Sequence, residues 1–102
     1  MARLRVRIKA RRATLKGDLV FTTVMQALAE TGKLFDSGSS WQIDLAGVRA
    51  ADSAALALML EWAARARARQ GYLRFEHPPE AILDLARVSH IDGLLGLTQA
   101  AA

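Results

Sequence analysis

Two strand-like segments flank one long helix-like segment in the middle of the chain. Trp41–Leu45 alternates apolar and polar residues between turn signals, which predicts a central β-strand. Ser53–Gln70 is rich in the helix formers Ala, Leu and Arg, with Asp52 placed to cap its start and Gly71 to end it. Tyr72–Phe75 is the next predicted strand. A strand–helix–strand unit implies a right-handed crossover between parallel strands, so this centre favours an α/β fold.

The N-terminal part of the chain adds two strands and a helix to this pattern. Strands are expected at 3–10 and at Ala13–Lys16, and Gly17–Asp18 is expected to form a turn or a bulge. Apolar residues then recur at three- and four-residue spacing over 19–31. This spacing predicts a helix that starts at Leu19 and ends at Gly32.

The C-terminal part completes the expected order of elements. Pro79 is predicted to start an amphipathic helix that runs to Val88. Asp36–Ser40 is a polar loop too short to link domains, and Thr98–Ala102 is expected to fray. The order ββαβαβα predicts one α/β domain over residues 1–102, with a mixed, largely parallel β-sheet and helices packed against it.

Composition limits the classes of function. The 102 residues are 52% hydrophobic, enough for one core, and the weakly polar run 50–64 is too short and too charged to span a bilayer. The absence of cysteine excludes disulfides, thiol catalysis and cysteine–metal sites, and we expect a cytoplasmic protein without a signal peptide. His77 and His90 fit no catalytic triad or metal-ligand spacing, and no phosphate-binding glycine loop is present. We therefore expect no enzyme activity, metal or cofactor.

The formal net charge of +4 is concentrated in the first strand. Its cations alternate with apolar residues, which predicts one buried face and one row of exposed positive charge. Two interpretations stay open: charges that prevent edge-to-edge association of sheets, or a binding surface for nucleic acid or anionic lipid. Because no aromatic residues are interleaved for base stacking, nucleic-acid binding is not expected. The cations are Arg3, Arg5, Arg7, Lys9, Arg11 and Arg12.

The segment from Asp44 to Leu56 carries the candidate site. Asp44 is expected near the end of its strand, Gly47 at a turn, and Ser53 at the start of the long helix. Free backbone N–H groups and the helix dipole favour negative charge at that position. Ser53 is therefore the candidate functional residue of this segment, unless it merely begins the helix.

Other residues around this segment are candidates for partner binding, each with a structural alternative. Asp52 either caps the helix alone or also orients Ser53, and Arg49 is expected in a loop, where it meets a partner carboxylate or solvent. Trp62 is expected away from the core stripe of the helix, as a partner anchor or as a core residue. The last apolar patch either closes the core or forms a homodimer contact; it consists of Leu94, Leu95 and Leu97.

Several short motifs, in order, resemble the STAS domain family, which includes the bacterial anti-sigma-factor antagonists. An apolar strand is followed by Asp44-Leu45-Ala46-Gly47-Val48, then Asp52-Ser53 and a Leu-rich helix, and Leu15-Lys16-Gly17-Asp18-Leu19 is similar to an early family signature. Within the family, Leu56-Ala57-Leu58 and Leu85-Ala86-Arg87 are most similar to the small STAS subunit of the Mla phospholipid transporter.

The resemblance implies a noncatalytic regulatory module with Ser53 at the phosphoacceptor position. One departure is Ala55, where regulatory members carry glycine. The expected partner is the ATPase subunit of an Mla-type ABC transporter at the inner face of the inner membrane. The alternative is an anti-sigma-factor antagonist that binds an anti-sigma-factor kinase and is regulated by phosphorylation of Ser53. The proposed partner-binding residues are Arg49, Asp52, Ser53, Ala54, Leu56 and Trp62.

Overall fold

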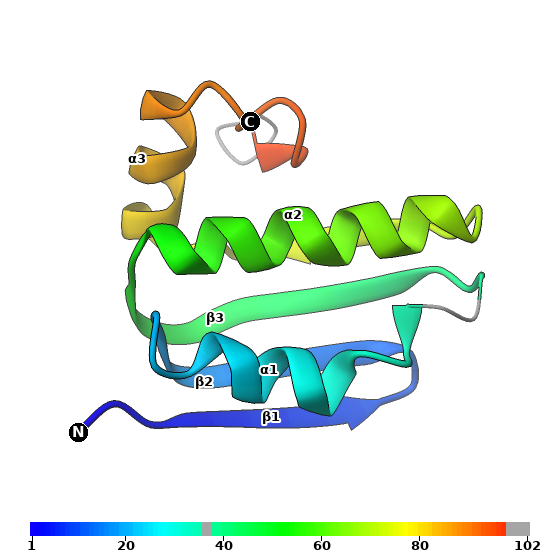
Figure 1. Ribbon diagram of the computed structural model, residues 1–102, viewed down its shortest axis with the longest axis horizontal. Helices are drawn as coiled ribbons and strands as arrows, with labels where there is room; N and C mark the ends of the chain where they lie inside the picture. Colours follow the sequence, from blue (N-terminus) through cyan, green and yellow to red (C-terminus); the bar gives the residue numbers. More distant parts are fainter. Residues whose placement is uncertain (36–37, 98–102) are drawn as a thin grey trace.

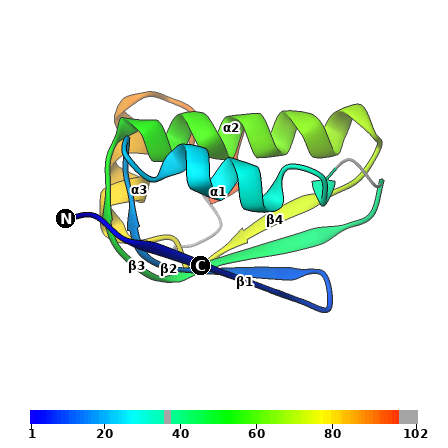
Figure 2. The ribbon, with the colours of Figure 1, turned by 60° about the horizontal axis from the view of Figure 1, so that its bottom comes forward.

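The computed structural model describes residues 1–35 and 38–97 and has the expected order of elements. A four-stranded sheet, in the order β1-β2-β3-β4, carries helices on one face, whereas none of the described helices covers the other face, which we call the uncovered face (Figures 1 and 2). The expectations for residues 36–37 and 98–102 lie outside the described residues. The strands are β1 (Leu4–Lys9), β2 (Arg12–Leu19), β3 (Trp41–Ala51) and β4 (Leu73–Glu76), and the helices are α1 (Val24–Thr31), α2 (Ser53–Ala68) and α3 (Glu80–Val88).

The sheet is mixed and largely parallel, as predicted. β1 pairs with β2 in antiparallel register, whereas β2–β3 and β3–β4 are parallel. The expected central strand is β3, which has a hydrogen-bonded neighbour on each side. Helix crossovers connect the parallel strands and place α1 and α2 over the same face of the sheet (Figure 2).

The prediction of a turn at Gly47 is wrong, because β3 continues without a break to Ala51. Asp44 therefore lies within the strand and not near its end. The β2–β3 register shifts between Thr14 and Lys16, and a Cβ on Gly47 would lie 2.6 Å from Cγ of Lys16. The glycine thus allows close approach of two strands.

The predicted start of the first helix is also wrong. Leu19 pairs with Ala51 in the sheet, and α1 begins only at Val24. The hydroxyl of Thr23 closes the intervening turn, donating to the carbonyl of Asp18 at 2.7 Å and accepting from the amide of Val20 at 3.0 Å. The expected bulge at Gly17–Asp18 is confirmed by a second register shift.

Apart from the start of α1, the helix boundaries follow the predictions within one or two residues. Gly32 caps α1, and Pro79 occupies the N-cap of α3. The left-handed backbone conformation after α2 falls on Gln70, with φ 61°, and not on Gly71. Gly71 is required for another reason, since its Cβ would lie 2.6 Å from the carbonyl oxygen of Ser39.

The core lies between the helices and the covered face of the sheet. Its largest fully buried side chains include Trp62, Phe35, Leu15, Ile43 and Met59. The C-terminal segment closes one side of this core, with Leu95 and Leu97 buried and Leu94 exposed. Core closure is confirmed for Leu95 and Leu97, whereas Leu94 takes no part in it and the homodimer contact stays a prediction.

Candidate functional site

The junction of β3 and α2 presents Ser53 to solvent. Asp52 adopts an extended conformation as N-cap, and its carboxylate accepts a hydrogen bond from the amide of Ala54 at 2.9 Å. This confirms the predicted cap. Ser53 is exposed, and its hydroxyl hydrogen-bonds to no other residue in the part of the chain that the structure describes. An accessible hydroxyl at the positive end of a helix dipole tolerates an added phosphate.

Asp52 also holds the turn between β2 and α1 beside this helix start. Its second carboxylate oxygen accepts a hydrogen bond from the amide of Phe21 at 3.0 Å. The side chain of Phe21 is 75% exposed, and that of Met25, one helical turn later, is 70% exposed. The starts of α1 and α2 thus share one end of the molecule (Figure 1). The exposed residues Phe21 and Met25 lie at this end, in the β2–α1 turn and in the first turn of α1. Exposed apolar groups beside a polar one are typical of protein-binding surfaces.

Sequence reasoning missed Phe21 and Met25. Both were placed within a predicted helix of the right type, but nothing local indicates that the helix begins later or that its start meets residue 52. An exposed aromatic residue in the β2–α1 turn becomes a site candidate only when the turn is placed beside α2.

The structure buries two of the predicted partner-binding residues. Leu56 is in the core, and Trp62 is fully buried, donating from Nε1 to Oγ1 of Thr31 at 2.8 Å and packing edge-on against Phe35. Trp62 is therefore a core residue, the alternative that its sequence context left open, and the two side chains are removed from the candidate surface. Ala54 is half-buried behind the cap.

Arg49 lies on β3 and not in a loop as expected. Its guanidinium is 76% exposed and stands 4.0 Å from the carboxylate of Asp18, too far for a hydrogen bond. Arg49 lines a hollow on the uncovered face together with Arg3 and Gly47. It therefore flanks the Ser53 junction on the opposite side of the sheet from the helices.

A second polar cluster ties three strands together away from Ser53. The Arg12 guanidinium lies 3.1 Å from Asp44 and 2.9 Å from Glu76, and Nδ1 of His77 lies 3.2 Å from Asp44. Burial alone would raise the pKa of Asp44, but hydrogen bonds from the Ala46 amide, Arg12 and His77 outweigh it and lower that pKa. The cluster joins β2, β3 and β4 on the uncovered face.

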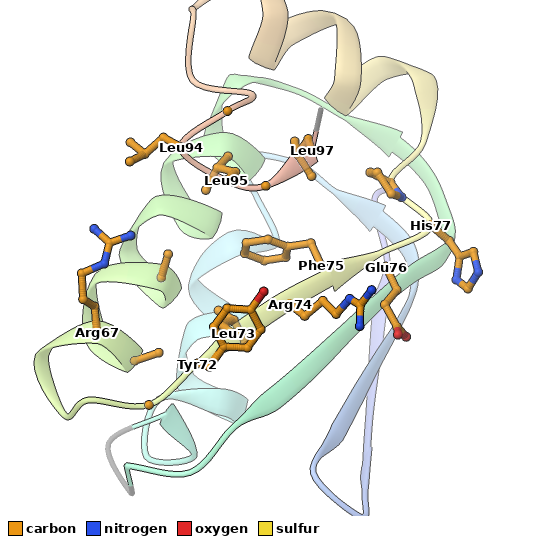
Figure 3. A pocket seen from close by; sticks show the side chains of 16 residues that line it. Arg67, Tyr72, Leu73, Arg74, Phe75, Glu76, His77, Leu94, Leu95 and Leu97 are labelled. Atoms are coloured by element: carbon orange, nitrogen blue, oxygen red, sulfur yellow. The ribbon is translucent and has the colours of Figure 1, made fainter. Parts of the chain in front are cut away.

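A groove of about 560 Å³ lies between α2, β4 and the C-terminal segment. Figure 3 shows Phe75 beneath Leu95 and Leu97, with Arg67 of α2 and Tyr72 nearer the other end. Among the described residues, no three His, Asp or Glu side chains form a group that would bind a metal ion. In the same residues no helix is long and apolar enough to cross a membrane.

The fold defines the class of protein. The chain matches the structure of the anti-sigma factor antagonist SpoIIAA in its unphosphorylated form with a TM-score of 0.68, at 14% identity, covering 87% of this chain and 82% of that one. It also matches a chain from the crystal structure of Mglu, with a TM-score of 0.58 and 20% identity, covering 74% of this chain and only 20% of that one. At these identities the matches show the fold alone, and that fold is the one of SpoIIAA.

The sequence adds the family. The family profile described as "Mlab, STAS domain" matches residues 4–97, and the chain belongs to that family. No curated protein matches the chain. The predicted resemblance is therefore confirmed for the STAS family and its Mlab branch.

Proposed function

We propose that this chain is a noncatalytic adaptor subunit that binds the ATPase of a bacterial Mla-type phospholipid ABC transporter and supports the assembly and activity of that transporter. The complex would hold the protein at the cytoplasmic face of the inner membrane. The contact surface consists of the exposed side chains of Phe21, Met25, Arg49 and Ser53, held in place by Asp52.

The observation that carries this proposal is the Mlab family match over residues 4–97. The arrangement of the junction supports the location of the surface, because the exposed Ser53 hydroxyl bonds to no described residue and Asp52 ties the exposed residue Phe21 to the same junction. Apolar anchors around a small polar group exclude water when a partner docks, and such anchors carry most of the energy of an interface.

The direct test is a pull-down from the native cell with tagged wild type beside Ser53→Glu, with bound proteins identified by mass spectrometry. We expect wild type to recover an ABC ATPase with its permease. Ser53→Glu should reduce recovery of the ATPase about tenfold or more. The reason is that an unpaired polar group desolvated in an interface costs about 1–3 kcal/mol of binding free energy, and a charged group costs more. Ala64→Glu is the matched control, because Ala64 is exposed on the same helix far from the junction.

The results distinguish the proposal from its alternative. Equal recovery by Ser53→Glu and Ala64→Glu would mean that the partner docks elsewhere. Recovery of a small kinase-like anti-sigma factor instead of the ATPase would favour an anti-sigma-factor antagonist, for which the accessible Ser53 hydroxyl is the supporting feature. In that case phosphorylation of Ser53 by the recovered kinase should dissociate the kinase from this protein. The mass increase of this protein would measure the phosphorylation.

A further inference from the structure

Among the described strands, none pairs with the outer row of backbone hydrogen-bonding groups of β1. It is at the edge of the sheet, and the amide of Asp18 donates to the carbonyl of Arg3 at 2.8 Å. Because bonding alternates along an antiparallel pair, Arg5, Arg7 and Lys9 point their backbone groups toward β2. The groups of Val6 and Ile8 then face outward. The carbonyl of Leu4, also outward, is already bonded to Nε2 of Gln26 at 2.9 Å.

The uncovered face beside this edge carries positive charges opposite one another. Across β1 and β2, Arg5 faces Lys16 and Lys9 faces Arg12. Like charges directly opposite destabilise a sheet. Arg12 is neutralised by Asp44 and Glu76, but no acidic side chain among residues 1–35 and 38–97 forms an ion pair with the other three.

Protection of an exposed edge does not account for all of these charges. Cations on β1 would discourage edge-to-edge association. Lys16, however, lies on β2, which has a strand on both sides. Together with Arg5, Arg7 and Thr14 it lines a hollow of about 290 Å³. The positive charges of Arg5, Arg7 and Lys16 therefore favour binding of an anionic group from another molecule.

The other side of the same strand is apolar and only partly covered. Leu4 is buried and Val6 is half-buried, but Ile8 is 44% exposed. A strand added at this edge would therefore meet cations on one face and apolar side chains on the other. Directly opposite residues of neighbouring strands point to the same face, so the best match alternates acidic and apolar residues.

We propose that the free edge of β1 is a strand-addition site for an extended segment of a partner protein that alternates acidic and apolar residues. Carboxylates of that segment lie opposite Arg5, Arg7 and Lys9, its apolar residues lie opposite Val6 and Ile8, and its backbone bonds the outward groups of these two. A second copy is disfavoured because its β1 would bring cations against cations. Ser53 itself is not part of this site, whereas Arg49 lines one hollow with Arg5 on the uncovered face.

The test uses the whole chain and a peptide of alternating Glu and Val with capped termini and the length of β1. Binding is followed by the NMR amide shifts of the protein. We expect saturable shifts along β1, and none with a peptide of alternating Lys and Val. A control peptide of the same composition, with all Glu residues in one block and all Val residues in another (the block peptide), should bind at least about tenfold more weakly. Ser53→Glu should bind the alternating peptide like wild type, so that failure here and failure at the junction are distinguishable.

Two variants separate strand addition from charge alone. Ile8→Pro removes an outward amide without removing a bond to β2, and should weaken peptide binding about tenfold while the thermal unfolding curve remains cooperative. Arg5→Glu combined with Arg7→Glu should also lose about tenfold. The matched control, Arg67→Glu in the last turn of α2 with Arg69→Glu at its C-cap, makes the same change in net charge and should stay within about twofold.

Several outcomes would overturn the inference. Equal binding of the block peptide or full binding by a folded Ile8→Pro would assign the effect to charge alone. If Ile8→Pro does not fold, unchanged binding by the Arg5/Arg7 variant is decisive against it. Stronger, salt-sensitive association with duplex DNA or with vesicles containing phosphatidylglycerol would assign the face to those polyanions instead. Absence of shifts at millimolar peptide would remove the site altogether.

Discussion

Replacing Asp52 by alanine tests whether one carboxylate joins the two halves of the candidate surface. Its two oxygens accept from the Ala54 amide at 2.9 Å and from the Phe21 amide at 3.0 Å. Loss of a helix N-cap costs about 1 kcal/mol. Loss of the partly exposed bond to Phe21 adds about 0.5–1 kcal/mol. We therefore expect Asp52→Ala to lower the free energy of unfolding by about 1.5–2 kcal/mol.

The assay is urea unfolding at neutral pH, followed by circular dichroism, with thermal unfolding beside it. At about 4–8 °C per kcal/mol for a domain of this size, Tm should fall by about 6–16 °C. Asp52→Asn keeps one acceptor oxygen and caps nearly as well as Asp. It should therefore lose only the contribution of the bond to Phe21, about 0.5–1 kcal/mol of the free energy of unfolding. Ser53→Ala is the neighbouring control and should stay within about 0.5 kcal/mol, because its hydroxyl bonds no described residue.

The reasoning would be refuted if Asp52→Ala unfolded within about 0.5 kcal/mol of wild type. It would also be refuted if Asp52→Ala and Ser53→Ala lost equal stability, since of the two side chains only that of Asp52 makes hydrogen bonds to described residues. Amide hydrogen exchange gives an independent measure: the Phe21 amide should exchange faster in Asp52→Ala than in wild type.

Three further perturbations test the fold. Thr31→Val leaves Nε1 of buried Trp62 without its acceptor, and should cost about 1–3 kcal/mol in urea unfolding, whereas Thr31→Ser should cost less. Gly17→Ala should lower Tm sharply, because φ there is 109° and the added Cβ would overlap the carbonyl oxygen of Arg3; unchanged Tm would contradict the β2 geometry. The lowered pKa of Asp44 means that the unfolded chain binds its proton more readily, so this contribution to stability is present above about pH 4 and is lost as pH falls further. Asp44→Asn should make the free energy of unfolding fall less steeply as the pH drops below about 4. An unchanged pH dependence would count against the ion cluster.

The sequence alone determined the type and order of the elements. Hydrophobic spacing, the Asp52 cap and the glycine and proline signals act within one turn or one strand, so they can be recognised without a tertiary structure. They predicted ββαβαβα, a largely parallel sheet and a helix that begins at Ser53, all as observed. The ion pair between Glu61 and Arg65, at 2.8 Å, followed from helical spacing in the same way.

Element ends and the membership of the surface were decided by contacts between distant residues. Pairing of Leu19 with Ala51 extends both strands past their predicted ends, because a backbone group that finds a ladder partner stays in the sheet. Trp62 is buried because Thr31 and Phe35 pack around it, which its own helix cannot show. Phe21 joins the site through a bond to Asp52, more than thirty positions along the chain. The sequence thus determined what each segment is, and only the tertiary structure decided which side chains it leaves free to bind, because exposure depends on neighbours that the chain brings together by folding.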